Sequence, residues 1–452
     1  MINTLPLHDG DDLVLVDNDV AAKLDGLELR LLANRVIAFH HNQFFDLQNI
    51  IAGRGAITRN GNPYDLRRQN LAVQHYNFGR HGELELHEPK TDSARFAVLT
   101  PTAGAAVLPT IHEVRLSPGD RLAFLPFEKT RNLPNIAADA IHNKGTQLSL
   151  SHWPSNRTPE RYKANLSTES VMKFLMSENP DYPADARYVT TDHFDLDGLA
   201  SVYALLAPEH AMKHKQLLID VGQFDDFARG HNPQARRLAF TLNTIAAQTP
   251  PPAGSTPHST GHIAAVFAKL LPAMRELLDA SVIQEELWRD TEQNYLATEA
   301  LLDNPNVMLE QYPELDLAVF RLPASEVPYE PEPRRYLGFS PIPFHNRTPL
   351  STIALVTQDD IVVHQRYEGW VELQSGAPRP RRDLSIFMRA LESAEPNGCP
   401  WYYDGVQYIM PRFGRGSSQP THLPIETILD ELKHFLAVAP PAWLSSPLIA
   451  SY

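Results

Sequence analysis

The stretch Ala186–Leu206, ARYVTTDHFDLDGLASVYALL, decides the fold that we expect for this chain. Its first part, Tyr188–Thr191, is apolar and β-branched, which predicts a strand. Gly198 then opens a segment whose apolar residues have helical spacing, which predicts a helix. A strand, a short acidic turn and a helix, in that order, are typical of an α/β core with a parallel sheet.

The turn between the strand and the helix contains three side chains that could share one metal ion. His193, Asp195 and Asp197 alternate in the sequence, so in an extended turn they point the same way. Imidazole and carboxylate groups that converge at the end of a strand are a common way to hold a divalent cation. The alternative is structural, with the acids capping the helix and Gly198 making the turn. Because one cap needs only one acid, we favour the metal or catalytic interpretation.

The composition is that of an ordinary soluble protein, with 452 residues of which 43% are hydrophobic and 21% charged. No apolar run approaches the ~20 residues of a membrane span, and the N-terminus lacks a secretory signal pattern. We therefore expect a cytoplasmic protein without a membrane partner. A single cysteine, Cys399, excludes an intramolecular disulfide and a cysteine-based zinc site. The net charge of −14 argues against broad, charge-driven binding to nucleic acid, but it does not exclude a local basic patch.

The N-terminal third, residues 1–122, is expected to be a β-rich module, because short β-type runs alternate with Gly and Asn. Within it, residues 59–71 read RNGNPYDLRRQNL. This run resembles the second half of the HNH-endonuclease signature. The Asp-His pair that precedes the turn in active members is replaced by Ile57, Thr58 and Arg59. The resemblance therefore implies a degenerate scaffold, and a plain β-hairpin is the alternative that we favour.

The same segment holds the best candidate for a nucleic-acid or phosphate patch. Its basic residues are Arg59, Arg67 and Arg68.

The middle of the chain, residues 123–330, is expected to be the α/β domain with the metal site. A strand at Thr146–Ser151 runs into His152 and a proline-flanked loop with Asn156, which has the character of a rigid binding loop. His152 joins the metal centre if its strand neighbours the one that ends at Thr191. The alternative is a hydrogen-bonded structural histidine.

A second strand is predicted at Gln216–Ile219, followed by Asp220. In a parallel sheet, an acid at the end of a neighbouring strand can add a ligand to the first centre. His258 and His262 are later candidates for a ligand or a proton-transfer group, and starting a helix is their structural alternative.

The run from Asp192 to Ser201, with Asp220 downstream, resembles the first two motifs of the DHH-family phosphoesterases, with His193 at the first acid position of their turn. The resemblance implies two manganese ions and hydrolysis of phosphodiesters or phosphoanhydrides by a metal-activated water. The chain departs from that family in having no Asp-His-His triplet after Asp220 and no Gly-Gly-Gly-His loop.

From about residue 123 onward the chain also resembles a bacterial protein family without an assigned activity. The shared runs are Ser-His-Trp-Pro-x-Asn at 151–156, His-Phe-Asp-x-Asp-Gly at 193–198 and Arg-Tyr-Glu-x-Trp at 366–370. This resemblance bears on domain limits and not on chemistry.

The C-terminal part, residues 331–452, is expected to be a smaller α+β domain that caps the site or binds substrate. Two strands, Thr352–Val356 and 361–371, are predicted to form a hairpin. In the second strand, alternation places Arg366 and Glu368 on one face. Arg366 then either pairs with Glu368 or clamps an anionic substrate.

Together these patterns predict a metal-dependent hydrolase that acts on a small anionic substrate. The resemblance to the DHH-family phosphoesterases implies that this substrate is a phosphodiester or a nucleotide. Ligand hardness favours Mn²⁺ or Mg²⁺, which would activate a water molecule near neutral pH. The expected metal ligands are His193, Asp195, Asp197 and Asp220. The expected catalytic residues are His193, His152 and Arg366, and the expected substrate-binding residues are Asn156, Arg347 and Arg366.

Two other classes of function remain open from the sequence. One is a non-catalytic protein that binds nucleic acid or another partner on a degenerate scaffold. The other is a metal-dependent biosynthetic or amide-cleaving enzyme. The sequence does not determine the oligomeric state.

Overall fold

The computed structural model describes residues 113–442 and, before residue 100, the backbone of nine short strands. Within 113–442 it leaves out residues 118, 154–155, 253–254, 256–258, 281–282, 324–337, 372, 376–380, 396–399, 407 and 416–420. In the part of the chain that is described, no helix combines the length and the apolar character needed to cross a membrane.

The N-terminal strands confirm the β-rich character predicted for this part of the chain. They are β1 (Asp12–Val14), β2 (Glu28–Leu32), β3 (Arg35–His40), β4 (Gln43–Asp46), β5 (Ile57–Arg59), β6 (Asn62–Tyr64), β7 (His75–Phe78), β8 (Leu84–His87) and β9 (Ala97–Leu99). Five of them form an antiparallel sheet in the order β4-β3-β2-β1-β9. In the β5–β6 pair Arg59 lies opposite Asn62, as in the hairpin predicted here. The side chains of Arg59, Arg67 and Arg68 lie outside the described residues, so the basic patch stays a prediction.

The α/β core contains the predicted parallel sheet. Its strands are β10 (Ala123–Phe124), β11 (Asn135–Ala138), β12 (Thr146–Leu150) and β13 (Tyr188–Thr190), in the order β10-β13-β11-β12. All neighbours are parallel. The strands predicted before His152 and before the acidic turn are therefore confirmed, and a single strand, β11, separates them.

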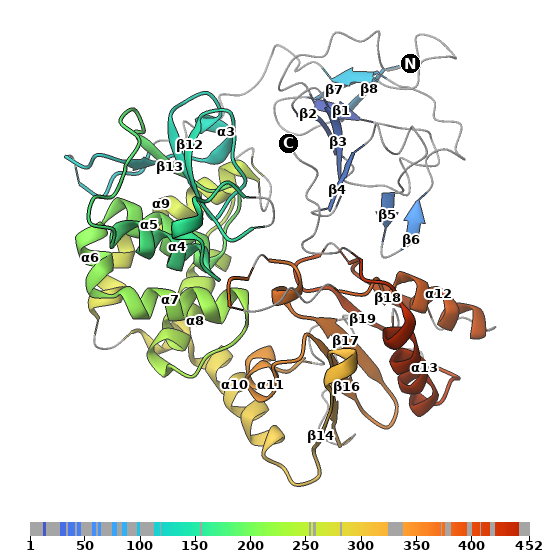
Figure 1. Cartoon of the computed structure of the whole chain (residues 1–452). Coiled ribbons are helices and arrows are strands. Elements are labelled where there is room, and N and C mark those ends of the chain that lie inside the picture. The colour runs from blue at the N-terminus through green and yellow to red at the C-terminus, as the bar shows by residue number, and fades with distance from the viewer. Residues whose placement is uncertain are drawn as a thin grey trace.

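Most helices of this part of the chain lie to one side of the sheet, and α10 (Arg289–Leu302) lies beside α11 (Pro341–Arg347) (Figure 1). The helices of this part are α3 (Phe127–Thr130), α4 (Ser167–Leu175), α5 (Leu196–Leu206), α6 (Pro208–Lys213), α7 (Lys215–Asp226), α8 (Pro233–Ala247), α9 (Thr260–Asp279) and α10, with single 3₁₀ turns η2 (Glu160–Tyr162) and η3 (Glu285–Leu287). Every residue of α5 is buried, as expected for a helix that is apolar on all sides. Phe124 of the sheet stacks on Phe267 of α9 at 4.4 Å, which helps to close the core.

The strand predicted at Gln216–Ile219 is wrong, because these residues lie inside helix α7. A short apolar run does not by itself distinguish a strand from a buried helical turn. Leu218, Val221 and Phe224 are all buried, and this spacing of three residues is helical. Asp220 consequently lies in the middle of a helix and not at the end of a strand.

A second, mixed sheet forms the C-terminal part. Its strands are β14 (Met308–Tyr312), β15 (Leu317–Arg321), β16 (Thr352–Val356), β17 (Ile361–Gln365), β18 (Trp401–Tyr403) and β19 (Arg412–Arg415), in the order β14-β15-β16-β17-β19-β18. The other elements here are α11 (Pro341–Arg347), α12 (Ser385–Ala394), α13 (Ile425–Val438), η4 (Pro313–Leu315) and η7 (Tyr367–Gly369). The β16–β17 hairpin is confirmed. The predicted continuation of the second strand to residue 371 is wrong, since β17 ends at Gln365 and a 3₁₀ turn follows.

Helix α11 attaches the second sheet to the α/β core (Figure 1). The Nδ1–H of His345 donates to the carbonyl of Phe227, directly after α7, at 2.8 Å. The Asn346 side chain exchanges two hydrogen bonds with the backbone of Gly230, at 2.8 and 3.0 Å. The loop after α7 is therefore held from the C-terminal part.

His345 also contacts His364 of β17, and the two Nε2 atoms are 3.0 Å apart. Because Nδ1 of His345 is the donor to Phe227, its Nε2 accepts a hydrogen bond from His364. Burial and then the Arg366 cation lower the pKa of His345 to about 3. Burial and then His345 lower the pKa of His364 well below its usual range.

This histidine pair predicts a loss of stability in acid. Between the unfolded pKa of about 6.5 and the folded value of about 3, the unfolded chain binds protons that the folded chain excludes, so the free energy of unfolding decreases as the pH falls. Urea unfolding at about pH 7.5 and about pH 5 measures this loss. In His364→Gln, which keeps a donor for His345 but does not titrate, the loss is expected to be smaller. An unchanged loss would contradict this explanation.

Candidate metal centre

Three neighbouring strands of the parallel sheet end at one place, and each is followed by a polar side chain. Asp139 follows β11, His152 follows β12, and the acidic turn that contains His193 follows β13. The carboxyl ends of parallel strands are where α/β proteins bind ligands. Asp139 has a φ of +49°, a left-handed conformation that is unusual for a non-glycine residue. Such strain persists only where the surroundings enforce it, and it often marks a functional site.

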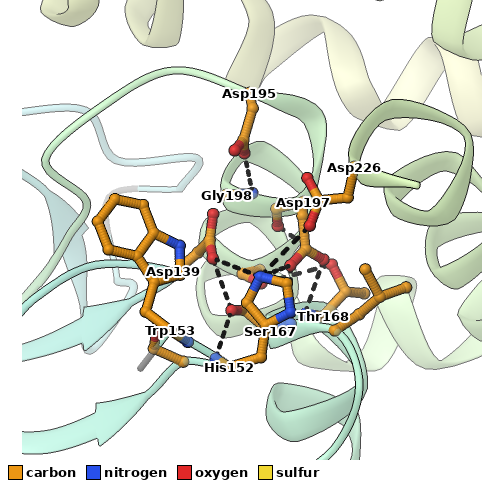
Figure 2. A network of polar contacts seen from close by, with 12 residues as sticks. Asp139, His152, Trp153, Ser167, Thr168, Asp195, Asp197, Gly198 and Asp226 are labelled. Atoms are coloured by element: carbon orange, nitrogen blue, oxygen red, sulfur yellow. Dashed lines mark hydrogen bonds and ion pairs between the residues drawn. The ribbon is translucent and has the colours of Figure 1, made fainter. Parts of the chain in front are cut away.

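His152 is buried at the centre of the cluster (Figure 2). Its Nδ1–H donates to the carbonyl of Asn165 at 2.5 Å, which leaves a lone pair on Nε2. That Nε2 lies 3.3 Å from Asp226, 3.6 Å from Asp139 and 3.9 Å from Asp197, measured to the nearest carboxylate oxygen. A ring fixed by a backbone carbonyl, with its other nitrogen facing carboxylates, is the usual arrangement of a metal-binding histidine.

Asp197 is held by the N-terminus of the neighbouring helix α4. Its carboxylate accepts hydrogen bonds from the backbone N–H groups of Ser167, at 2.7 Å, and Thr168, at 2.9 Å. Asp195 caps its own helix by accepting from the N–H of Gly198 at 2.7 Å. The capping interpretation is therefore correct for Asp195, which caps α5, whereas Asp197 caps the neighbouring helix α4. Each cap orients a carboxylate toward the cluster or its rim.

His193 lies on the more open side of the cluster, where its side chain is 25% exposed. Its Nδ1 is 2.8 Å from Asp192 and its Nε2 is 2.6 Å from Asp195. The same Nε2 lies 3.5 Å from Oδ2 of Asp139. The two oxygens of Asp139 therefore face different histidines, Oδ1 toward His152 and Oδ2 toward His193.

The charges of this cluster are strongly coupled. Burial and then the charge of Asp195 raise the pKa of Asp139 well above its usual range. Burial and then Asp197 do the same to the pKa of Asp226. Burial and then Asp195 raise the pKa of Asp225 to about 6. Asp195 differs, because burial raises its pKa but the charge of His193 and the hydrogen bonds from His193 and Gly198 together lower it to about 2.

The arrangement fits a divalent cation. Oδ2 of Asp139 and Oδ2 of Asp226 are buried but accept no hydrogen bond from the described residues, and such oxygens are costly to bury without a partner. Among the described residues, two groups here have ligand atoms close enough for one ion, and both include Asp139. They are Asp139–His152–Asp197 and Asp139–His193–Asp195.

A model of the family described as "Family of unknown function (DUF6687)" matches residues 120–447. This chain belongs to DUF6687. The matched region contains both sheets described after residue 120 and every residue of the cluster. No curated protein and no solved structure matches the chain. Because the family description names no activity, the resemblances to DHH phosphoesterases and to HNH endonucleases stay predictions.

In this DUF6687 chain, Asp220 lies outside the cluster although we predicted it as a ligand. Its carboxylate accepts hydrogen bonds from Gln216 at 2.8 Å and from Asn232 at 2.7 Å. The carboxylate that does reach the cluster from α7 is Asp226, at the C-terminal end of the same helix. Our prediction had the right segment and the wrong acid, because it treated a helix as a strand.

Asp139 and Asp226 belong to the cluster but were not predicted from the sequence. Asp139 carried a usable signal, since it follows the buried strand Asn135–Ala138 just as the acidic turn follows β13. Asp226 carried none, because an acid at the end of an amphipathic helix is an ordinary surface feature.

The other predicted site residues have structural partners. Asn156 bonds within its own loop, donating to the carbonyl of Trp153 and accepting from the N–H of Thr158. His262 lies within hydrogen-bond distance of the carbonyl of Thr249, at 2.8 Å. His258 lies outside the described residues.

The two predicted arginines are engaged in ion pairs. Arg347 bonds to Glu299 at 2.8 Å and to Asp303 at 2.7 Å. Arg366 is buried, pairs through two nitrogens with Glu368, and donates to the carbonyl of Thr348 at 2.7 Å. The structural alternative therefore describes Arg366 best.

The C-terminal part contributes aromatic side chains to the site. The hydroxyl of Tyr367 is 3.5 Å from Nε2 of His152. Trp370 packs edge-on against Trp153 at 5.4 Å, and Trp153 lies 4.9 Å from the ring of His193. These rings form a wall beside the histidines.

Arg366 is expected to support the fold more strongly than Arg347. Arg366→Ala leaves Glu368 and a buried carbonyl without their partner, which is expected to cost about 3 kcal/mol of unfolding free energy. Arg347→Ala removes more exposed ion pairs and is expected to cost about 1 kcal/mol or less. Urea unfolding of both variants measures the difference. Equal effects would contradict the structural role assigned to Arg366.

Gly222 of α7 is expected to control the position of Asp197. A Cβ added at Gly222 would lie 2.8 Å from Oδ1 of Asp197, so the carboxylate must move. Gly222→Ala is expected to weaken Mn²⁺ binding about 10-fold or more, while higher helix propensity helps to keep α7 folded. Gly119→Ala, whose Cβ meets nothing within 4 Å, is the control. Isothermal titration with MnCl₂ measures both, and equal affinities would refute the prediction.

Proposed function

We propose that this protein is a metal-dependent hydrolase that cleaves a phosphodiester or nucleotide substrate. The observation that carries the proposal is the orientation of Asp139, whose two carboxylate oxygens face two histidines at 3.5 and 3.6 Å. A carboxylate shared between two ligand groups is suited to bridge two ions, as in the two-metal sites of many phosphoryl-transfer enzymes.

The residues that would hold the ions belong to two overlapping groups. His152, Asp197 and Asp226 surround one side of Asp139, and His193 and Asp195 surround the other. Ligand sets with several carboxylates and an imidazole suit Mn²⁺. Mg²⁺ is the second candidate, because it is a hard cation that prefers oxygen ligands. Divalent cations would also offset the repulsion among these acids, which burial makes costly.

A bound divalent ion would supply an activated water nucleophile near neutral pH and would stabilise negative charge on the substrate. The Nδ1 of His193 is 2.8 Å from Asp192, so this carboxylate would orient the ring while Nε2 binds an ion. Tyr367 places a hydroxyl beside His152, where it could donate a hydrogen bond to a substrate oxygen.

One feature supports a substrate with a flat ring. Trp153, next to the partly exposed His193, offers a ring on which a nucleobase could stack. The phosphate part of the proposal also draws on the resemblance of residues 192–201 to DHH phosphoesterases.

The test is hydrolysis of a substrate panel by the full chain after chelation and dialysis, with Mn²⁺ or Mg²⁺ added back. The panel contains bis-(p-nitrophenyl) phosphate, short single-stranded DNA and RNA, and nucleotides. Asp139→Asn and Asp197→Asn are expected to lower kcat/KM by about 100-fold or more, since even residues behind the ligands cost about 10–100-fold. Asp220→Asn is the matched control and is expected to retain activity.

The outcomes separate the alternatives. Mn²⁺ binding without hydrolysis of the panel would favour an amide-cleaving or biosynthetic enzyme. Hydrolysis that persists in Asp139→Asn and Asp197→Asn would show that another site is responsible. The absence of both metal binding and hydrolysis would refute the proposal.

A further inference from the structure

A second group of potential metal ligands lies near the opposite end of α5 from the candidate centre. His210 is in α6, His214 directly follows α6, and Asp279 is the last residue of α9. We propose that these three side chains form a separate site for a borderline transition-metal cation such as Zn²⁺. The proposal does not depend on the hydrolase function.

The geometry suits a single small ion. The rings of His210 and His214 lie side by side, with centroids 4.8 Å apart. Their Nε2 atoms lie 3.1 and 2.9 Å from the same oxygen, Oδ1 of Asp279. All three ligand atoms lie within 4.8 Å of one another. Ligands bonded at ~2.0–2.2 Å to a tetrahedral ion are about 3.3–3.6 Å apart, so a small outward movement of the carboxylate makes room.

Tyr203 of α5 supports one of the two imidazoles. Its hydroxyl is 2.7 Å from Nδ1 of His210, and Tyr203 is buried in the core. When Nε2 of His210 binds an ion, Nδ1 carries the proton and donates a hydrogen bond to the hydroxyl oxygen of Tyr203. A partner on the second ring nitrogen is a regular feature of metal-binding histidines because it fixes the orientation of the ring.

The ligand set distinguishes this site from the candidate centre. Two imidazoles and one carboxylate match zinc sites that have three protein ligands and a water in the fourth position. The Asp279 side chain is 57% exposed, so an ion can reach the site from solvent. The candidate centre is richer in carboxylates and favours harder ions. One chain would thus bind two kinds of metal at its two sites.

The position of the site gives a bound ion a structural role. The ion would join the turn before α7 to the end of α9, and Tyr203 connects it to α5. Helix α5 begins with the acids of the candidate centre, and α7 ends at Asp226. A bound zinc ion would therefore fix the C-terminal end of α5 and the N-terminal end of α7. The opposite ends of these two helices carry ligands of the candidate centre.

The test is a titration of the metal-free full chain with ZnCl₂, followed by calorimetry and by zinc content after gel filtration. We expect Asp279→Asn and His214→Gln each to bind about one zinc fewer per chain than the wild type, or to bind it at least about 10-fold more weakly. His231→Gln, at an exposed histidine outside the group, is the control and is expected to bind like the wild type.

The centre is excluded as the source of the signal by repeating the titration in Asp139→Asn. There we expect the zinc lost with Asp279→Asn to persist, and Co²⁺ at the same site to give the visible absorption of a tetrahedral complex. Circular dichroism checks that each variant is folded. If His214→Gln does not fold, Asp279→Asn alone tests the proposal, because the Asp279 side chain is exposed. Zinc binding that is equal in the wild type and in Asp279→Asn would overturn the proposal and leave a plain histidine–aspartate ion pair.

Discussion

The burial of several carboxylates in one small volume is the constraint on which the rest of this structure depends. Asp139, Asp197 and Asp226 are nearly inaccessible to water and surround the nitrogen of one histidine. Like charges at such distances do not ionise together without compensation, and burial alone disfavours each charge. Such an arrangement is expected where a cation is part of the working protein, and much of the α/β core serves to hold these acids in place.

The N-termini of two helices hold two of the acids through capping hydrogen bonds. The first turn of α5 supplies the carboxylate of Asp197, which caps α4, while Asp195 caps α5 itself. A polar side chain in the core must find hydrogen-bond partners, and helix N-termini have free N–H groups to give. Each acid therefore accepts hydrogen bonds from the free N–H groups of a helix N-terminus, and these bonds fix the orientation of its carboxylate. Gly222 permits α7 to come close enough to complete the packing around Asp197.

The C-terminal part takes part in the same arrangement. Its helix α11 holds the loop that follows Asp226, and its 3₁₀ turn η7 places Tyr367 over His152. Arg366 supports both features, because it bonds to the carbonyl of Thr348 after α11 and precedes Tyr367 in the chain. An arginine that looks like a substrate clamp in the sequence is thus a structural residue that positions its neighbour. The family match extends over both parts, in agreement with their shared site.

Local patterns in the sequence were sufficient for the elements whose periodicity is unambiguous. The strand, acidic turn and helix around His193, the strand before His152 and the β16–β17 hairpin follow from them. The run at 216–219 was not sufficient, because a polar residue followed by only three apolar ones fits a strand or a helical turn equally well. Only packing against α5 and α8 selects the helix.

The sequence by itself thus determined the fold class and one half of the candidate centre, His193 with Asp195 and Asp197, because those ligands are neighbours in the chain. Only the tertiary structure decided the other half. Asp139 and Asp226 reach the cluster because β11 lies between β12 and β13 and because α7 ends beside His152. Strand order and helix packing depend on contacts between distant segments, and no local pattern of residues records them.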